Sequence, residues 1–181
     1  MKKLWLILAV STLGFSVQAQ FSKGTLQATG LTCAMCSNAV NKALQKVPSV
    51  ASIRSDIKNS SFSITFKEHA EIDIDALKNA VEDAGFSVGS LQLTGRFNQV
   101  NIAKDQHVQI GNSEFHFLGV EKQTLNGEKT LKVVDKDFLT AKEFKKVSNS
   151  TTLECIQTGR ASSCCIKDGI PAMTRIYHVT I

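Results

Sequence analysis

Two cysteines three positions apart are the residues of this chain best suited to chemistry. Cys33 and Cys36 stand where an apolar segment gives way to a helical pattern. Both sulfurs can point inward from one short loop, and a pair of thiolates favours Cu(I), Zn(II) or Hg(II) over hard ions. The free N–H groups and partial positive charge of a helix start also lower the pKa of Cys36. Metal binding and thiol–disulfide chemistry both use such a thiolate, so the pair by itself leaves both open.

The elements that position this pair follow from the hydrophobic pattern around it. Apolar residues alternate in the strand-like segments and recur at helical spacing between them, where Pro48 stops the first helical run. Asp73 and Gly85 are suitable caps for a second helix. The predicted order is strand, helix, strand, strand, helix, strand, over residues 21–29, 36–47, 50–57, 62–66, 74–84 and 86–93. This is the split βαβ plan of an α+β, ferredoxin-like domain with both helices on one side of the sheet.

Two motifs within this framework carry a family resemblance. Thr32-Cys33-Ala34-Met35-Cys36 lies between strand and helix, and Val81-Glu82-Asp83-Ala84-Gly85-Phe86 ends the second helix. Together they resemble the heavy-metal-associated domain of copper chaperones, copper-transporting ATPases and the periplasmic mercuric-ion binding protein. The resemblance covers residues 21–93.

This resemblance implies roles for particular residues. Cys33 and Cys36 would be the two metal ligands, with Thr32 in the binding loop. Phe86 would lie in a loop facing the metal. Leu31 stands where the family usually has Met, and we expect it to pack as an isosteric replacement. The resemblance also implies a metal-donor or metal-acceptor protein as partner.

The first residues predict an export signal over residues 1–19. Lys2 and Lys3 precede an apolar run that is too short to span a bilayer as a stable helix, and a cut is expected after Ala19. A retained anchor is the alternative. We expect a periplasmic or secreted protein with no membrane segment after cleavage, in a compartment where disulfides can persist.

The charge pattern argues against a nucleic-acid partner. The formal net charge is +5, and removal of the signal lowers it further. The remaining basic surplus lies after residue 90 and is interspersed with Glu and Asp, which is typical of a solvated surface.

The rest of the chain predicts a second domain. We expect the metal-binding domain at residues 20–90 and a small, mainly-β domain at residues 91–181. Its expected elements are three strands, a helix and two strands, over residues 91–103, 107–118, 131–134, 137–147, 151–156 and 173–181, with an Asn126-Gly127 turn before the third strand. This order fits an OB-like barrel, although no family motif supports it.

Three further cysteines gather near the end of the chain. Because export favours disulfides, we expect Cys155 to pair with Cys164 or Cys165 across the polar loop between them. The alternative is a second soft-metal site that uses two or three of these thiols, with Met173 or His178 as a further ligand.

Isolated histidines and methionines receive no role at this stage. A lone histidine in a strand pattern is more often a surface residue than a ligand, so His69, His107, His116 and His178 stay unassigned. Met35 is interpreted as a surface or packing residue rather than a thioether ligand.

The function predicted from these observations is that of an exported carrier, not an enzyme. We expect it to hold Cu(I) between Cys33 and Cys36, with Zn(II) and Hg(II) also compatible with the ligands. A thiol–disulfide oxidoreductase would use the same pair, but the loop lacks a flanking aromatic residue, and Pro48 and Pro171 are poorly placed for a cis-proline beside it. A third class is an interaction protein whose second half docks a partner and whose metal domain acts as a sensor.

Overall fold

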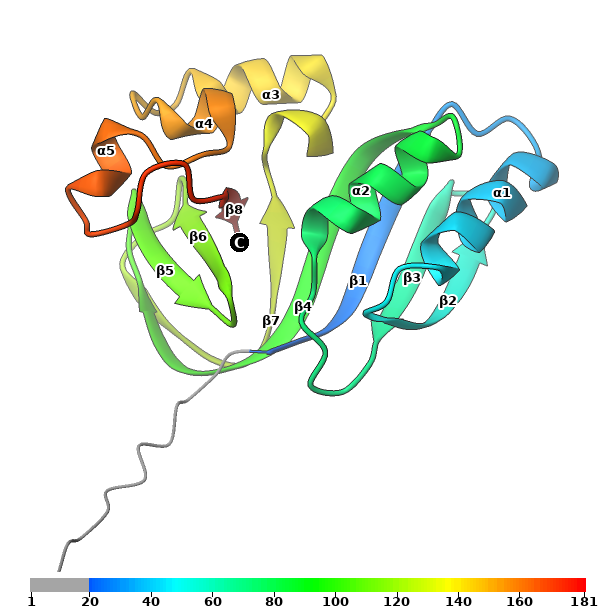
Figure 1. Ribbon diagram of the computed structural model, residues 1–181, viewed down its shortest axis with the longest axis horizontal. Coiled ribbons are helices and arrows are strands. Elements are labelled where there is room, and N and C mark those ends of the chain that lie inside the picture. Colours follow the sequence, from blue (N-terminus) through cyan, green and yellow to red (C-terminus); the bar gives the residue numbers. More distant parts are fainter. Residues whose placement is uncertain (1–19) are drawn as a thin grey trace, which may run out of the picture.

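A computed structural model describes residues 20–181 (Figure 1). The predicted signal peptide at residues 1–19 lies outside the described residues. In residues 20–181, no helix is both long and apolar enough to cross a membrane.

The first half of the chain folds as a four-stranded antiparallel sheet with two helices. Its elements are β1 (Gln20–Thr29), α1 (Ala34–Gln45), β2 (Val50–Asp56), β3 (Ser61–Phe66), α2 (Ile74–Asp83) and β4 (Ser87–Ile102). The strand order is β2-β3-β1-β4, and each neighbouring pair is antiparallel. This order, with a helix after β1 and after β3, is the predicted ferredoxin-like plan.

The ends of both helices have local causes. The Sγ atom of Cys33 accepts a hydrogen bond from the backbone N–H of Cys36 at the start of α1. Asp73 caps α2 by accepting from the backbone N–H of Ala76 at 2.9 Å. Gly85 follows α2 with φ +86, a conformation that glycine adopts without strain. These caps begin α1 at the cysteine loop and place the start of β4 directly after α2.

The second half extends the same sheet. Its elements are β5 (Gln106–Ile110), β6 (Ser113–Phe117), β7 (Gln123–Val133), the 3₁₀ helix η1 (Lys136–Phe138), α3 (Ala141–Ser148), α4 (Cys155–Thr158), α5 (Ser163–Ile166) and β8 (Ile176–Thr180). Over residues 20–181 the full order is β2-β3-β1-β4-β7-β8-β6-β5, in which only β6 and β8 are parallel neighbours. The labelled helices lie on the same side of this curved sheet in Figure 1.

The OB-like barrel expected for residues 91–181 is therefore not confirmed. The described strands form one open sheet whose edges are β2 and β5. Strand β4 is 16 residues long, and it pairs with β1 on one side and with β7 on the other. Because β4 is shared, the expected domain boundary between residues 90 and 91 falls inside a single strand.

Three local predictions in this half are wrong. The single strand expected at residues 107–118 is the antiparallel hairpin of β5 and β6. Asn126-Gly127 lies inside β7 instead of forming a turn, and the β4–β7 register shifts between Phe97 and Val100. Gly127, whose φ is +76, therefore lies opposite a β-bulge in β4. The strand expected at residues 151–156 is a loop followed by the first turn of α4.

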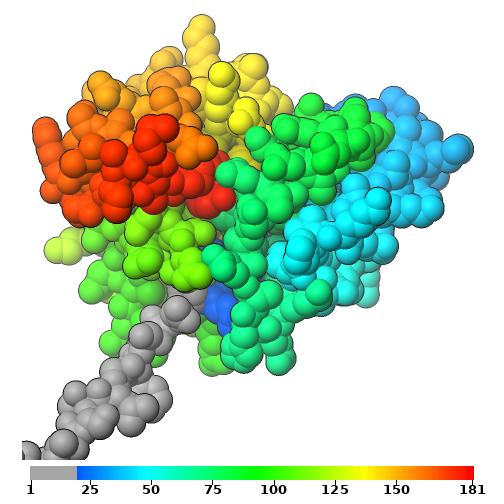
Figure 2. Space-filling view, viewed as in Figure 1, coloured from blue at the N-terminus to red at the C-terminus, as the bar shows by residue number. Residues whose placement is uncertain are grey.

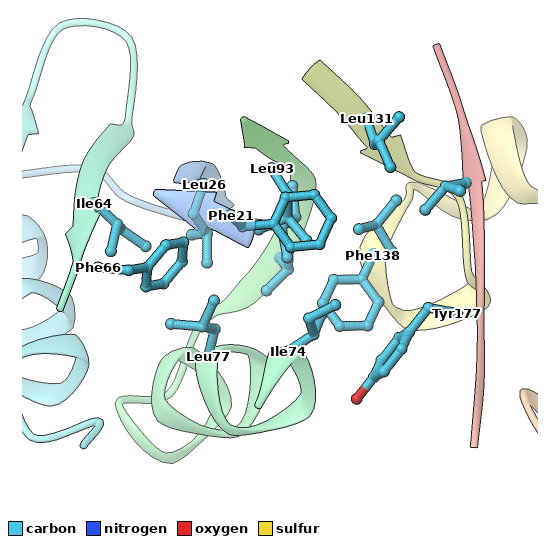
Figure 3. Packing of buried hydrophobic residues seen from close by; sticks show 14 of the residues in the cluster. Phe21, Leu26, Ile64, Phe66, Ile74, Leu77, Leu93, Leu131, Phe138 and Tyr177 are labelled. Carbon is cyan, nitrogen blue, oxygen red and sulfur yellow. The ribbon is translucent and has the colours of Figure 1, made fainter. Parts of the chain in front are cut away.

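One hydrophobic core joins the two halves. Figure 3 shows Ile74 and Leu77 of α2 pointing toward the sheet, with Phe138 and Tyr177 of the second half packed beside them. The ring of Phe21 from β1 lies close to rings of the second half of the chain. Apolar burial of this kind is the main favourable term in folding, so the halves stabilise each other.

An ion-pair network adds a second connection. Arg175 donates through Nε and Nη2 to both carboxylate oxygens of Asp75 on α2, at 2.8 and 3.0 Å, and through Nη2 to Asp135 at 3.0 Å. Burial opposes ionisation of Asp75, but the guanidinium of Arg175 outweighs it and lowers the pKa of Asp75. Figure 2 shows the end of the chain (red) against the region of α2 (green).

Candidate metal centre

The cysteine loop lies at the N-terminal end of α1, on the outer edge of the molecule (Figure 1). The two sulfur atoms, Cys33 Sγ and Cys36 Sγ, are 2.8 Å apart. Cys33 is exposed and Cys36 is half-buried. The pair therefore presents two soft donors to solvent from a single turn, which is the arrangement that one thiophilic ion needs.

The surroundings of Cys36 favour its thiolate. The hydrogen bond from the Cys33 thiol is the largest cause that lowers the pKa of Cys36, followed by the backbone of Thr32. The hydroxyl of Thr32 also lies 4.0 Å from Cys36 Sγ. A lowered pKa reduces the free-energy cost of removing the proton that a bound metal ion displaces.

The neighbours of the loop form its support. Leu31 is half-buried and packs against the main core, as expected for a replacement of Met. Phe86 also packs against the core, beside Gly30 at the base of the loop. Met35 is 83% exposed, consistent with a surface residue.

The comparisons with known proteins agree with this geometry. The family model for the heavy-metal-associated domain matches residues 25–87. The mercuric transport protein periplasmic component of Serratia marcescens is 34% identical over 86 residues, which are 48% of this chain and 93% of that protein. The chain belongs to the heavy-metal-associated family.

Other relatives match the same part of this heavy-metal-associated protein. A probable copper-transporting ATPase of Arabidopsis thaliana is 27% identical over 81 residues, which are 45% of this chain but only 8% of the ATPase. A solved structure of the CopZ metallochaperone is 28% identical with a TM-score of 0.34, and the match covers 37% of this chain and 98% of CopZ. The family match ends at residue 87, so the second half has to be interpreted from its own geometry.

The structure gathers the three C-terminal cysteines of this heavy-metal-associated protein in one place. Their sulfur atoms all lie within 4.8 Å of one another, and Cys164 Sγ is 3.4 Å from Cys165 Sγ. Cys155 and Cys165 are buried, whereas Cys164 is half-buried. All three are thiols here, so the expected disulfide from Cys155 is not confirmed.

The protonation of these thiols differs with their surroundings. Burial raises the pKa of the Cys155 thiol well above its ordinary value. At Cys164 burial acts in the same direction, but hydrogen bonds, with Ser162 the largest contributor, outweigh it and lower the pKa to about 7. The outermost thiol of the cluster is thus the one that ionises most readily.

Three histidines that the sequence left unassigned are buried beside these cysteines. His107 pairs with His116 between β5 and β6, and His116 pairs with His178 between β6 and β8, so the three form one row across the sheet. His116 and His178 are fully buried, and the side chain of His107 is 6% exposed. His116 Nδ1 lies 3.5 Å and His178 Nε2 lies 3.3 Å from Cys155 Sγ. The general expectation that a lone strand histidine lies at the surface does not hold for these three.

A carboxylate also contacts this cluster. Asp135, which the sequence analysis did not single out, lies 2.6 Å through Oδ1 from Nδ1 of His178. These residues meet only because Asp135 follows β7 and His178 lies on β8, so no local pattern could have revealed the contact. Met173, suggested as a further ligand, is 65% exposed, and His69 is exposed as its surface interpretation expects.

Proposed function

We propose that this protein is an exported carrier of Cu(I) and that Cys33 and Cys36 are its ligands. The observation that supports this most directly is the pair of sulfurs 2.8 Å apart on an exposed loop of a heavy-metal-associated domain. The lowered pKa of Cys36 favours the thiolate form that binds a soft ion. Soft thiolate ligands select soft ions.

The number of donors argues for an ion of low coordination number. Among the described residues, Cys33 and Cys36 belong to no group of three Cys, His, Asp or Glu ligand atoms within 4.8 Å of one another. Zn(II) is almost always held by four ligands in closed sites, whereas Cu(I) and Hg(II) accept two thiolates. Between these two we propose Cu(I), the ion normally available to cells, and treat Hg(II) as the competitor to be measured.

An exposed, two-coordinate ion can be exchanged quickly. The thiolate of a partner can approach the loop from solvent and add as a third ligand, after which one of the two original sulfurs is released. Two strong soft ligands give tight binding, and the open position gives a low barrier to transfer. We therefore propose a thiolate-bearing donor or acceptor protein as partner, and no enzymatic reaction is needed.

A Cu(I) titration of the reduced mature protein, followed by anaerobic native mass spectrometry and competition with a Cu(I) chelator, tests the proposal. The variant with both Cys33→Ser and Cys36→Ser should lose one bound Cu(I). Met35→Ala changes an exposed residue of the same loop and is the matched control.

Unchanged affinity and stoichiometry in the double variant would refute the proposal. Rapid cycling of the pair between thiol and disulfide, with no metal bound, would favour the oxidoreductase. A parallel titration with Hg(II) decides between the two ions.

Export is a separate part of the proposal. Residues 1–19 should direct the chain out of the cytoplasm and be removed after Ala19. Cell fractionation with N-terminal sequencing of the accumulated protein measures both points. An intact Met1 in the cytoplasmic fraction would contradict export while leaving the metal-binding proposal standing.

A further inference from the structure

The cluster around Cys155 brings together several side chains of the types that bind metal ions, which a hydrophobic core does not need. Three cysteine sulfurs lie together, and two imidazole nitrogens approach Cys155 Sγ at 3.3 and 3.5 Å. Cys155 itself is fully buried, and it belongs to two groups of close donor atoms. One group is Cys155, Cys164 and Cys165, and the other is Cys155, His107 and His116.

Unpartnered imidazole nitrogens indicate that this region is built for a ligand. The Nε2 atoms of His107 and His116 are buried and have no hydrogen-bond partner among the described residues. A buried polar atom without a partner costs about 1–3 kcal/mol of stability, so proteins rarely keep two side by side without a use for them. Their rings stack with centroids 4.3 Å apart.

Two of the histidines have a carboxylate within hydrogen-bond distance of one ring nitrogen. Asp135 Oδ1 lies 2.6 Å from His178 Nδ1, and Asp168 Oδ2 lies 2.9 Å from His107 Nδ1. A carboxylate that accepts from one ring nitrogen fixes the tautomer and leaves the other nitrogen free to accept, as in many metal sites. In this tautomer, His178 Nε2 accepts the thiol hydrogen of Cys155 and holds its sulfur in place.

We propose that Cys155, Cys164 and Cys165 form a second metal site that binds one thiophilic ion, Cu(I), through three sulfurs. Three sulfurs around one ion at about 2.3 Å stand about 4 Å apart. The three sulfurs here lie within 4.8 Å of one another, and one pair is 3.4 Å apart, so small side-chain rotations complete the arrangement. This site is independent of Cys33 and Cys36, and it goes beyond the carrier function.

An ion can reach the site from solvent at Cys164. Cys164 is half-buried, whereas Cys155 and Cys165 are closed off from solvent. An incoming ion therefore meets Cys164 first and is then enclosed by the two buried sulfurs. Because a partner thiolate can reach the bound ion only past Cys164, we expect this ion to exchange more slowly than one held by Cys33 and Cys36.

The test uses the full mature chain with Cys33→Ser and Cys36→Ser, reduced and shown to have three free thiols, titrated with Cu(I) alone. Anaerobic native mass spectrometry should show one bound Cu(I). Chelator competition should show at least a 100-fold loss of affinity after a further Cys164→Ser change, at a position exposed enough to keep the fold. His69→Ala, at an exposed histidine, is the matched control and should change nothing.

Several outcomes would overturn the assignment. Absence of bound Cu(I) in the Cys33→Ser and Cys36→Ser protein would do so, and the carrier proposal would still stand on the wild-type titration. Binding that survives Cys164→Ser and Cys165→Ser but is lost with His107→Ala and His116→Ala would move the site to the histidine group. Detection of a disulfide from Cys155 to Cys164 or Cys165, by peptide mapping of the exported protein before reduction, would also overturn it. That result would show that the cluster is a structural disulfide and not a metal site.

Discussion

The two cysteine sites of this protein differ in how they are built. Cys33 and Cys36 come from one turn, face solvent and have no third protein donor nearby among the described residues. The cluster around Cys155 is assembled from two short helices and three strands, and its central sulfur is fully buried. Exposure and a low donor number suit rapid exchange, whereas burial and more donors suit retention. Under the two proposals, one chain would hold the same kind of ion in two ways.

The positions of the sites add to this contrast. In Figure 1 the start of α1 lies at one end of the long axis, and α4 and α5 lie at the other end. Segments that are far apart in a projection are far apart in space. Direct transfer of an ion between the two sites of one molecule would therefore need a large movement or a partner.

Thiol reactivity gives the largest expected difference between the sites. In the reduced, folded, metal-free protein, alkylation of Cys155 should be on the order of 10³-fold slower than that of Cys36, because burial limits access and suppresses the thiolate. Timed alkylation with mass spectrometry of peptides measures both rates. Equal rates would show that the C-terminal cluster opens readily.

Stability should separate the sites next. Cys155→Ala removes a buried sulfur and leaves two imidazoles without their contact, so it should lower the free energy of unfolding by about 2–3 kcal/mol. Cys36→Ala, at the half-buried loop, is the control and should stay within about 0.5 kcal/mol. Urea unfolding followed by circular dichroism measures both values. Similar losses in the two variants would contradict the distinction between a structural cluster and a surface loop.

The ion pair that links the halves predicts a pH-dependent effect. Asp75→Asn should cost about 1–2 kcal/mol at pH 7, because it removes one carboxylate from Arg175. The pKa of Asp75 is lower in the folded state than its ordinary 3.8, so this stabilisation is present above that pH and is lost as the pH falls through the folded value. The difference between the two proteins should then fade in acid.

Urea titrations of the wild type and Asp75→Asn at several pH values test this expectation. Asp137→Asn is the matched control, since Asp137 pairs with Lys78 at the surface and its side chain is 58% exposed. A difference between wild type and Asp75→Asn that stays constant from pH 7 to strong acid would show that ionisation of Asp75 does not hold the two halves together.

The smallest expected effect concerns Met35, one of the two residues between the loop cysteines. Met35 is 83% exposed, so Met35→Ala should change Cu(I) affinity by less than about twofold and should not change stability. Chelator competition measures the affinity. A tenfold loss would show that the thioether is a third ligand and would weaken the contrast in donor number.

The first half was predicted well from the sequence because its signals are local. The alternation of Phe62, Ile64 and Phe66, the cap at Asp73 and the glycine at position 85 each act within a few residues. The second half gave the opposite result. Asn126-Gly127 usually marks a hairpin turn, but here it lies opposite a bulge because β4 is long enough to pair across it.

The two candidate sites also differ in whether local sequence signals could reveal them. The loop of Cys33 and Cys36 could be named from spacing alone, since both thiols and the helix start lie within one turn. The row of His107, His116 and His178 could not, because it depends on pairing β6 with β8 in parallel, across 62 residues of chain. A histidine in a strand carries no local sign of whether its face will be buried.

Sequence alone determined the loop of Cys33 and Cys36, its supporting fold and the presence of three cysteines near the end of the chain. Tertiary structure alone decided that the second half extends the first sheet, that three histidines lie beside Cys155 and that Asp135 contacts one of them. The reason is that spacing and capping act between neighbours in sequence, whereas burial and strand pairing depend on which distant segments meet.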